Sequence, residues 1–408
     1  MLKCGLLGRK LGHSYSPAIH KELGDYEYRI YEKEPEELED FVLNGDWAGL
    51  NVTIPYKKDV PAYCDELSET ARRIGTVNTM VKRPDGTIYG DNTDVYGFAS
   101  LVRKSGIDPK AGKVLVLGSG GASAAVLEAL RQVNVTPVVI SRSGADNYTN
   151  LDRHSDAAVI INTTPLGMYP NTGVSPVDLG LFPKLQGVLD VVYNPARTQI
   201  LLDAEARGIP NANGLYMLVA QAKQSSECFT GSAIPDSEID RVMRKLAAEM
   251  MNIVIIGMPG SGKSTAAKLL AERTGREVVD ADAAWEAKYG ETIQDFIHAQ
   301  GEAAFRERET AVLAELGKRS GIIISAGGGV VTREENYPLL HQNGTIVRLE
   351  RDIDLLAREG RPLSIGSDLR AMYAVRAPMY ERFADITVNN DGSIERTVDE
   401  ILAKLETI

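Results

Sequence analysis

The chain has 408 residues, which exceeds the size of one ordinary core and predicts about two to four folding units. Its formal net charge is −11 without any long basic run, which argues against nucleic acid or an anionic membrane as a partner, because both select clustered Lys and Arg. Its apolar runs fall short of the roughly 18–20 residues that span a bilayer, and its three cysteines have neither disulfide nor metal-site spacing, so we expect a cytoplasmic protein.

The first 100 residues begin with a strand-like apolar run at 4–8 and then carry four short polar motifs. In chain order these are HSYSP at 13–17, NVTIPYK at 51–57, GTVNT at 75–79 and GDNTD at 90–94. The residues that lead to Lys57 are unusually apolar for an exposed surface lysine. This context indicates a functional lysine rather than a solvated one.

A second strand-like run, at 113–118, leads into a glycine turn and an alanine-rich helix. This is a shortened dinucleotide fingerprint, in which a helix N-terminus can hold a pyrophosphate. The turn residues predicted to bind the cofactor are Gly118, Gly120, Gly121 and Ala122. The next strand, 137–140, ends at Ser141, Arg142 and Ser143. An arginine flanked by hydroxyls suits a ribose 2′-phosphate, so the sequence favours NADP over NAD.

The segment that follows is short. Only about 15 residues separate Ser143 from the next strand-like run, 158–162. That is too few for the helix and strand that a complete dinucleotide fold places there. We therefore expect a trimmed Rossmann domain.

Three further motifs complete this half of the chain: NTTPLGM at 162–168, DVVYNP at 190–195 and GLYMLVAQ at 214–221. Together with the earlier motifs, this ordered series resembles shikimate dehydrogenase over residues 1 to about 245. The resemblance implies NADPH-dependent reduction of 3-dehydroshikimate to shikimate, with Lys57 and Asp94 as the catalytic pair. It also implies substrate-binding roles for Ser14, Ser16, Asn51, Thr53, Asn78, Tyr193 and Gln221. Val95 and Phe229 depart from the family pattern, which usually has Gly and Trp there.

The junction between the two halves has no linker. A charged helix predicted over 237–249 ends at Met250 and Met251, and an apolar strand follows at once, over 252–257. The segment from Met251 resembles the start of an independent gene. We therefore favour a fusion of two proteins over a chance pair of methionines within one domain.

The strand at 252–257 runs into a P-loop pattern that a helix follows, which is the required context. In such a loop, backbone N–H groups surround phosphate oxygens, the lysine reaches the terminal phosphates and the hydroxyl after it can ligate Mg²⁺. The residues that we predict to bind ATP are Gly257, Gly260, Gly262, Lys263, Ser264 and Thr265. A P-loop alone indicates phosphoryl transfer and no particular acceptor.

The acceptor is indicated by motifs that follow in order: DAD at 280–282, GEAAFRERE at 301–309, GGG at 327–329, RPL at 361–363 and RAPMYERFAD at 376–385. This series resembles shikimate kinase over residues 251–408. The resemblance implies that Asp280 and Ser264 orient Mg²⁺ and that Asp282 accepts a hydrogen bond from the substrate hydroxyl. It implies substrate contacts from Arg306, Gly328, Gly329 and Arg376, and charge stabilisation by Lys263 and Arg361. Arg358 is a candidate for stacking on adenine, although the stretches between Arg358, Arg361 and Arg376 are shorter than in the usual lid.

The expected fold class is therefore α/β with parallel sheets. We expect an N-terminal substrate-binding domain over 1–100, to which 214–249 returns, a Rossmann-like NADP-binding domain over 101–213 and a P-loop kinase domain over 251–408.

Two alternatives remain at this point. One is a quinate-type NAD dehydrogenase fused to a related small-molecule kinase, against which Arg142 and the pair Ser14 and Ser16 speak. The other is a non-catalytic dehydrogenase-like module that regulates an active kinase, which retention of both Lys57 and Asp94 disfavours.

Overall fold

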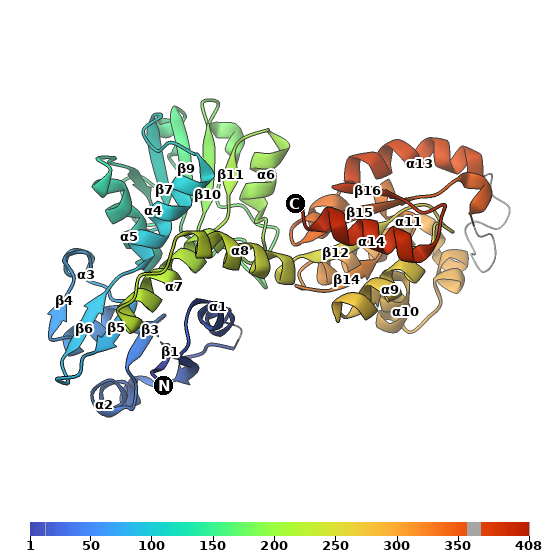
Figure 1. The fold of residues 1–408 in the computed structure, drawn as a ribbon. Coiled ribbons are helices and arrows are strands. Elements are labelled where there is room, and N and C mark those ends of the chain that lie inside the picture. The colour runs from blue at the N-terminus through green and yellow to red at the C-terminus, as the bar shows by residue number, and fades with distance from the viewer. Residues whose placement is uncertain (13, 357–368, 408) are drawn as a thin grey trace. The chain divides into compact units, whose positions relative to one another are not determined.

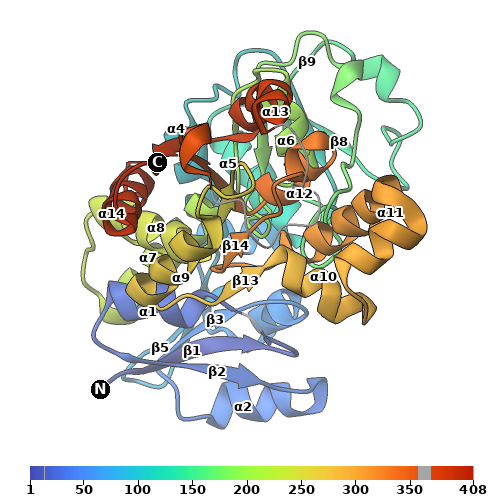
Figure 2. The same cartoon turned by 90° about the vertical axis from the view of Figure 1, so that its right-hand side faces the viewer.

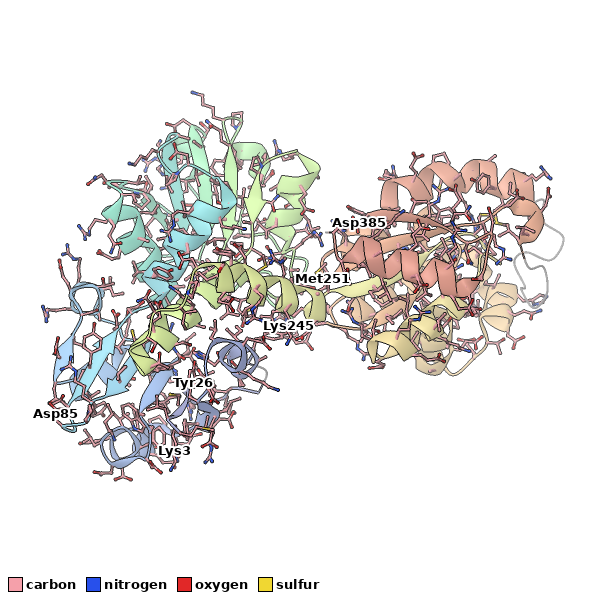
Figure 3. The ribbon with its side chains drawn as sticks, in the orientation of Figure 1. Lys3, Tyr26, Asp85, Lys245, Met251 and Asp385 are labelled. Carbon is pink, nitrogen blue, oxygen red and sulfur yellow. The ribbon has the colours of Figure 1, made fainter. Side chains whose placement is uncertain are left out.

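In the computed structural model, the structure describes residues 1–12, 14–356 and 369–407. The chain forms two compact units. The first comprises Met1–Met168, Val174–Tyr193 and Ile200–Leu246, and the second comprises Tyr169–Gly173, Asn194–Gln199 and Ala247–Ile408. Figure 3 labels Met251, which lies between the last helix of the first half of the sequence and the strand that follows it.

The first unit holds a mixed sheet with the strand order β2-β1-β3-β5-β6-β4. Its strands are β1 (Lys3–Gly8), β2 (Glu27–Glu32), β3 (Gly49–Val52), β4 (Glu66–Leu67), β5 (Thr79–Lys82) and β6 (Ile88–Asp91). β1 pairs in parallel with β2 and β3, whereas β5 is antiparallel to both β3 and β6. The turn between β5 and β6 is too short for a crossover, so these two strands pair as a hairpin. The parallel pairing expected from the sequence thus holds for only part of this sheet.

Helices cover this sheet and close its core (Figure 1). They are α1 (Ser16–Leu23), α2 (Leu38–Asn44) and α3 (Glu69–Ile74). A later helix, α7 (Leu215–Thr230), returns to this sheet, where it contacts β3, β5 and α1. Its other neighbour is α4 (Asp94–Ser105), the helix that follows β6. Segments far apart in the sequence therefore meet beside β3 and β5.

A second sheet, with all pairings parallel, has the order β11-β10-β9-β7-β8. Its strands are β7 (Lys113–Leu117), β8 (Val138–Ile140), β9 (Ala157–Asn162), β10 (Gly187–Asp190) and β11 (Asn211–Ala212). Helices α5 (Gly121–Gln132) and α6 (Gln199–Ala206) belong to it. Alternate side chains of β7 enter two separate cores, with Val114 and Val116 in one and Leu115 and Leu117 in the other.

The trimming expected from the sequence is visible at the edge of this second sheet. Between β8 and β9 the chain forms loops and one short 3-10 helix, Leu151–His154. β8 is therefore the edge strand. A parallel crossover needs about a dozen residues or more for its helix alone, which leaves no room here for an additional strand beyond β8.

The second unit is built on a third sheet, again parallel, with the order β13-β14-β12-β15-β16. Its strands are β12 (Asn252–Ile256), β13 (Val278–Asp280), β14 (Ile323–Ser325), β15 (Gly344–Glu350) and β16 (Ile386–Asn389). Its helices are α9 (Lys263–Thr274), α10 (Ala281–Tyr289), α11 (Ile293–Leu316), α12 (Asn336–His341), α13 (Leu369–Phe383) and α14 (Ile394–Leu405), preceded in the chain by α8 (Ser237–Met250). Figure 2 shows β13 and β14 side by side near α9 and α10.

The central strand β12 is buried on both faces. Val254 and Ile256 pack into one core and Ile253 and Ile255 into the other, which explains its unbroken apolar sequence. Within the described ranges, no helix is both long and apolar enough to cross a membrane.

Candidate active sites

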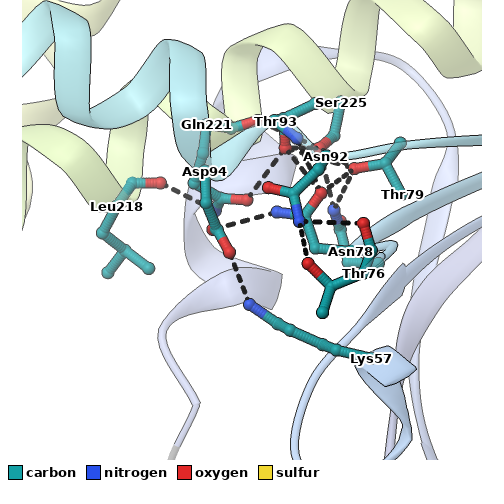
Figure 4. A network of polar contacts seen from close by, with 11 residues as sticks. Lys57, Thr76, Asn78, Thr79, Asn92, Thr93, Asp94, Leu218, Gln221 and Ser225 are labelled. Atoms are coloured by element: carbon teal, nitrogen blue, oxygen red, sulfur yellow. Dashed lines mark hydrogen bonds and ion pairs between the residues drawn. The ribbon is translucent and has the colours of Figure 1, made fainter. Parts of the chain in front are cut away.

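The first site is built around an ion pair between Lys57 and Asp94 (Figure 4). Lys57 lies in a 3-10 turn after β3, and Asp94 is the first residue of α4. Lys57 Nζ donates to Asp94 Oδ2 at 2.6 Å, and Asn78 Nδ2 donates to Asp94 Oδ1 at 2.9 Å. The lysine and aspartate side chains are 24% and 13% exposed, so the pair is largely withdrawn from water while the lysine keeps some contact with solvent. Such a lysine can pass a proton to a bound oxygen and recover one from solvent.

Asn78 connects this pair to the start of α4. Its Oδ1 accepts a hydrogen bond from the Thr93 backbone N–H at 2.8 Å, while its Nδ2 holds Asp94. The Thr93 hydroxyl lies 3.4 Å from Gln221 Oε1 on α7. Strand β5, helix α4 and helix α7 thus contribute to one polar cluster.

Five of the residues predicted from the sequence meet here, namely Lys57, Asp94, Asn78, Gln221 and Asn51. Asn51 lies on β3 and its Nδ2 donates to Ser225 Oγ at 2.8 Å. Ser225 was not predicted, although it follows Gln221 by one helical turn, so the helical period could have placed it on the same face.

The other predicted substrate ligands lie around the start of α1. The Ser16 backbone N–H donates to Ser14 Oγ at 3.2 Å. Between these serines, the Tyr15 ring meets the Tyr193 ring edge-to-face, with 6.0 Å between the centroids. Tyr193 follows β10 of the second sheet, so this contact joins the two sheets of the first unit at the two serines. Thr53 follows β3, where its backbone N–H donates to the carbonyl of Leu7 at 2.9 Å.

The glycine turn after β7 has the form of a phosphate cradle. Gly118 has φ of 103°, and a Cβ there would press against Thr163 and Thr164, so this position requires glycine. Gly120 is the N-cap residue of α5 and Gly121 its first residue, and apart from their chain neighbours and the helix backbone no heavy atom of the described residues lies within 4 Å of where their Cβ atoms would stand. A diphosphate can approach that open helix N-terminus, followed by Ala122. Arg142 is exposed in the loop after β8.

The second site contains the P-loop between β12 and α9. Gly257, Gly260 and Gly262 have φ of 151°, 90° and 91°, a backbone that side-chain-bearing residues rarely adopt. Lys263 Nζ donates to the carbonyls of Gly257 and Met258 at 2.9 and 3.0 Å, which curls the loop around the lysine. Thr265 lies next to Ser264 in the first turn of α9.

Ser264 and Asp280 lie close enough to share a metal ion. The Ser264 hydroxyl donates to Asp280 Oδ2 at 3.1 Å. Asp280 is the last residue of β13 and caps α10, accepting hydrogen bonds from the backbone N–H groups of Asp282 and Ala283. One hydroxyl and one carboxylate fit Mg²⁺, which usually takes few protein ligands and keeps waters and phosphate oxygens. Asp282 belongs to the first turn of α10 rather than to β13, because the Asp280 cap starts the helix there.

Asp282 lies beside a second buried carboxylate, that of Glu309. A Cβ at Gly327 would stand 2.9 Å from Asp282 Oδ1 and 2.8 Å from Glu309 Oε1, so both carboxylates face the same glycine. Burial, reinforced by Glu309 and Asp280, raises the pKa of Asp282 to about 6. Burial also raises the pKa of Glu309, although Arg306 opposes that effect.

Arg306 and Arg376 meet at the glycines after β14. Arg306 is buried, and a Cβ at Gly329 would overlap its guanidinium. Arg376 Nη1 donates to the Gly328 carbonyl at 3.1 Å, and the Tyr380 hydroxyl donates to the same oxygen. Two guanidinium groups at one backbone segment can hold a carboxylate. Glu309 and Tyr380 were not assigned from the sequence, although each lies three or four residues after a predicted arginine on one helix. Arg358 and Arg361 lie outside the described residues.

Comparison with known proteins assigns each half of the chain. The family model for the shikimate dehydrogenase substrate binding domain matches residues 6–80, and that for shikimate kinase matches residues 259–406. A shikimate dehydrogenase (NADP(+)) of Clostridium perfringens is 33% identical over 264 residues, covering 59% of this chain and 97% of that protein. One from Caldicellulosiruptor bescii is 37% identical over 253 residues, covering 54% and 87%.

Solved structures of shikimate dehydrogenases are similar to 60% of the chain. A chorismate mutase/shikimate 5-dehydrogenase fusion protein from Clostridium acetobutylicum has a TM-score of 0.56 and 37% identity, covering 60% of this chain and 97% of that chain. Shikimate 5-dehydrogenase from Thermus thermophilus, in complex with NADP(H) and shikimate, has a TM-score of 0.55 and 31% identity, covering 60% and 99%. The chain therefore belongs to the shikimate dehydrogenase family, and it carries a shikimate kinase domain in residues 259–406.

Proposed function

We propose that this chain catalyses two consecutive reactions, the NADPH-dependent reduction of 3-dehydroshikimate to shikimate and the Mg-ATP-dependent phosphorylation of shikimate to shikimate 3-phosphate. The observation that supports this most directly is the presence in one chain of the Lys57–Asp94 pair at 2.6 Å and a P-loop followed by the Asp280–Asp282 pair. Residues 1–100 with 214–249 bind the substrate of the first reaction, residues 101–213 bind NADP and residues 251–408 form the kinase. Both substrates are small molecules in the cytoplasm, and neither nucleic acid nor membrane takes part.

In the first reaction, Gly118, Gly120, Gly121 and Ala122 would hold NADPH, which would supply the hydride for the C3 carbonyl carbon. The Lys57 ammonium donates its proton to the C3 oxygen as negative charge develops there, and Asp94 holds the ammonium in place through their 2.6 Å hydrogen bond. Ser14 and Ser16 hold the substrate carboxylate with Tyr193 nearby, and Asn51, Thr53, Asn78 and Gln221 bind ring hydroxyls. Arg142 binds the 2′-phosphate that distinguishes NADP from NAD.

In the second reaction, Gly257, Gly260, Gly262, Lys263, Ser264 and Thr265 would hold Mg-ATP, which would supply the phosphoryl group. Arg306, Arg376 and the glycines at 328 and 329 hold the shikimate carboxylate and ring. Asp282 accepts the hydrogen bond of the C3 hydroxyl and positions it for attack. Ser264 and Asp280 would hold Mg²⁺, Lys263 and Arg361 would stabilise charge on the transferred group, and Arg358 would stack on adenine.

The test is a sequential assay of the full chain. With 3-dehydroshikimate, we expect consumption of NADPH and much slower consumption of NADH. Addition of Mg-ATP should then convert the shikimate formed into shikimate 3-phosphate with stoichiometric release of ADP. Binding of NADPH without turnover would instead identify the first unit as a non-catalytic module. Preference for quinate and NAD would identify a quinate-type enzyme.

A further inference from the structure

Ser225 lies buried in the first active site, where its hydroxyl contacts polar groups from several elements. Its side chain is fully buried, and its hydroxyl donates to the Gln221 carbonyl one turn earlier at 3.0 Å. Asn51 Nδ2 lies 2.8 Å from the same oxygen. Thr79 Oγ1 and Thr93 Oγ1 lie 2.8 and 3.0 Å from it (Figure 4). A hydroxyl has one proton and two lone pairs. With its proton directed at Gln221, the Ser225 oxygen accepts from Asn51 Nδ2 and from one of the two threonine hydroxyls.

Asn51 is held at both ends of its amide. Its Nδ2 faces Ser225, and its Oδ1 accepts a hydrogen bond from the Tyr28 hydroxyl at 2.7 Å. The Tyr28 ring is itself fixed, since it stacks on the His20 ring with 4.0 Å between the centroids. Rotation of the amide by half a turn would place its nitrogen against the phenol and its oxygen against Ser225. Such a change in a site that is 5% exposed would break both hydrogen bonds as now arranged.

Ser225 is also linked to the Asp94 carboxylate, through the side chains of Thr93 and Asn78. Thr93 occupies the N-cap position of α4 and directly precedes Asp94. The Thr93 hydroxyl lies between Ser225 Oγ at 3.0 Å and Asn78 Oδ1 at 3.2 Å. Asn78 in turn donates to Asp94. The same serine thus contacts one residue that binds substrate and one that precedes the proton-transfer pair.

We propose that Ser225 is a positioning residue for the dehydrogenase reaction and that, with Tyr28, it presents the Asn51 amide in one orientation to the substrate ring. The remaining lone pair of Asn51 Oδ1 then accepts from a ring hydroxyl. This inference rests on the proposed function of the first unit. It differs from a purely structural role for Ser225, in which the small side chain only lets α7 approach the sheet.

Ser225→Ala in the full chain tests the proposal. We expect KM for 3-dehydroshikimate to rise about tenfold, with a smaller fall in kcat and with KM for NADPH unchanged. Kinase activity on supplied shikimate should stay at the wild-type level, since the other unit carries it. The matched control is Ser226→Ala, the next residue of α7, which is equally buried but bonds Tyr26 and His20. This variant should keep KM within about twofold of the wild type.

A double-mutant cycle separates positioning from packing. If Ser225 acts through Asn51, then Ser225→Ala should raise KM only slightly in an Asn51→Ala background. Tyr28→Phe, which removes the hydroxyl at the other end of the amide, should raise KM in the same direction and remains informative if Ser225→Ala fails to fold. Independent effects in the cycle, or unchanged KM in both Ser225→Ala and Tyr28→Phe, would overturn the proposal. Failure of the proposed function would appear differently, as absence of NADPH-dependent reduction in the wild type.

Discussion

The guanidinium of Arg306 donates to the buried carboxylate of Glu309 at 2.7 Å. Its other edge donates to Glu302, whose side chain is 51% exposed. Glu309 is only 5% exposed, so the two carboxylates are not equivalent partners. A buried ion pair costs much when one member is removed, whereas an exposed pair contributes little. The arginine that we propose to hold the shikimate carboxylate is therefore fixed mainly by Glu309.

We expect Glu309→Gln to raise KM for shikimate in the kinase reaction by about tenfold. Glutamine keeps the size of the side chain, but Arg306 loses its buried counter-charge and its fixed direction. KM for Mg-ATP should stay unchanged, because the P-loop is untouched. The matched control is Glu302→Gln, which should change KM for shikimate by less than about threefold. Equal effects of the two substitutions on KM for shikimate would show that the burial of the carboxylate partner does not determine how firmly Arg306 is held.

The glutamate illustrates what could be read from the sequence. The motif of residues 301–309 led to Arg306, and a three-residue spacing on a helix would have pointed to Glu309 as its partner. Ser225 and Tyr28 are different. The helical period places Ser225 on the same face as Gln221, but the contacts of Ser225 and Tyr28 arise from the packing of α7 on β3 and β5, which joins segments 174 residues apart. Sequence patterns report local periodicity, so contacts of this kind become visible only in the fold.

The fold class and the glycine loops could be predicted from the sequence more fully than the order and direction of the strands in each sheet. The parallel second and third sheets follow from the alternation of strands and helices, and the shortened spacing after Ser143 correctly predicted that a helix and a strand are missing beside β8. The antiparallel β5–β6 hairpin was not predicted, because both strands are only four residues long. The roles assigned to individual site residues remain predictions, which the following substitutions test.

Lys57→Ala should reduce dehydrogenase kcat by at least about 10²–10⁴-fold, the usual worth of one positioned acid–base group. The substitution removes the proton donor and leaves Asp94 unpaired. Kinase activity measured on the same preparation with supplied shikimate should be normal. Lys58→Ala is the matched control, because Lys58 is adjacent and exposed. A Lys57→Ala enzyme that retained most of its turnover would exclude Lys57 as the proton donor.

Arg142→Asp should raise KM for NADPH far more than KM for NADH, since it places an anion where the 2′-phosphate would bind. The expected loss for NADPH is about 10²-fold, the scale of a charge-assisted contact turned into a repulsive one. Arg153→Asp provides the control, because Arg153 is also exposed and lies in the 3-10 helix before β9. If both cofactors lost affinity equally, the NADP assignment would have no support from this residue.

His20 predicts a pH dependence of stability in the first unit. Burial lowers the pKa of His20 to about 3, against about 6.5 in an unfolded chain. Below about pH 6.5, His20 therefore binds a proton in the unfolded state but stays neutral in the folded state. The free energy of unfolding consequently falls as pH decreases from about 6.5 toward 3. The slope from this residue is at most about 1.4 kcal/mol per pH unit.

The measurement is urea unfolding between pH 7.5 and 5, followed by the fluorescence of Trp47 in a Trp285→Phe background, because Trp47 belongs to the core of the first unit. His20→Phe retains an aromatic ring against Tyr28 and cannot titrate. Its unfolding free energy should depend less steeply on pH than that of the unsubstituted His20 chain. Parallel pH profiles for the two chains would contradict the prediction.

Asp280 and Asp282 are predicted to have different roles in the kinase reaction, the first in binding Mg²⁺ and the second in positioning the substrate hydroxyl. Asp280 lies 3.1 Å from the Ser264 hydroxyl, whereas Asp282 faces Gly327 together with Glu309. Asp282→Asn should lower phosphoryl transfer to shikimate by about 10²–10⁴-fold and leave Mg-ATP binding nearly unchanged, because the acceptor hydroxyl loses its charged partner. Asp280→Asn should instead raise the Mg²⁺ concentration needed for half-maximal rate. Titrating both variants with Mg²⁺ and with shikimate distinguishes the two roles, and a change in Mg²⁺ dependence alone for Asp282→Asn would show that the assignment is reversed.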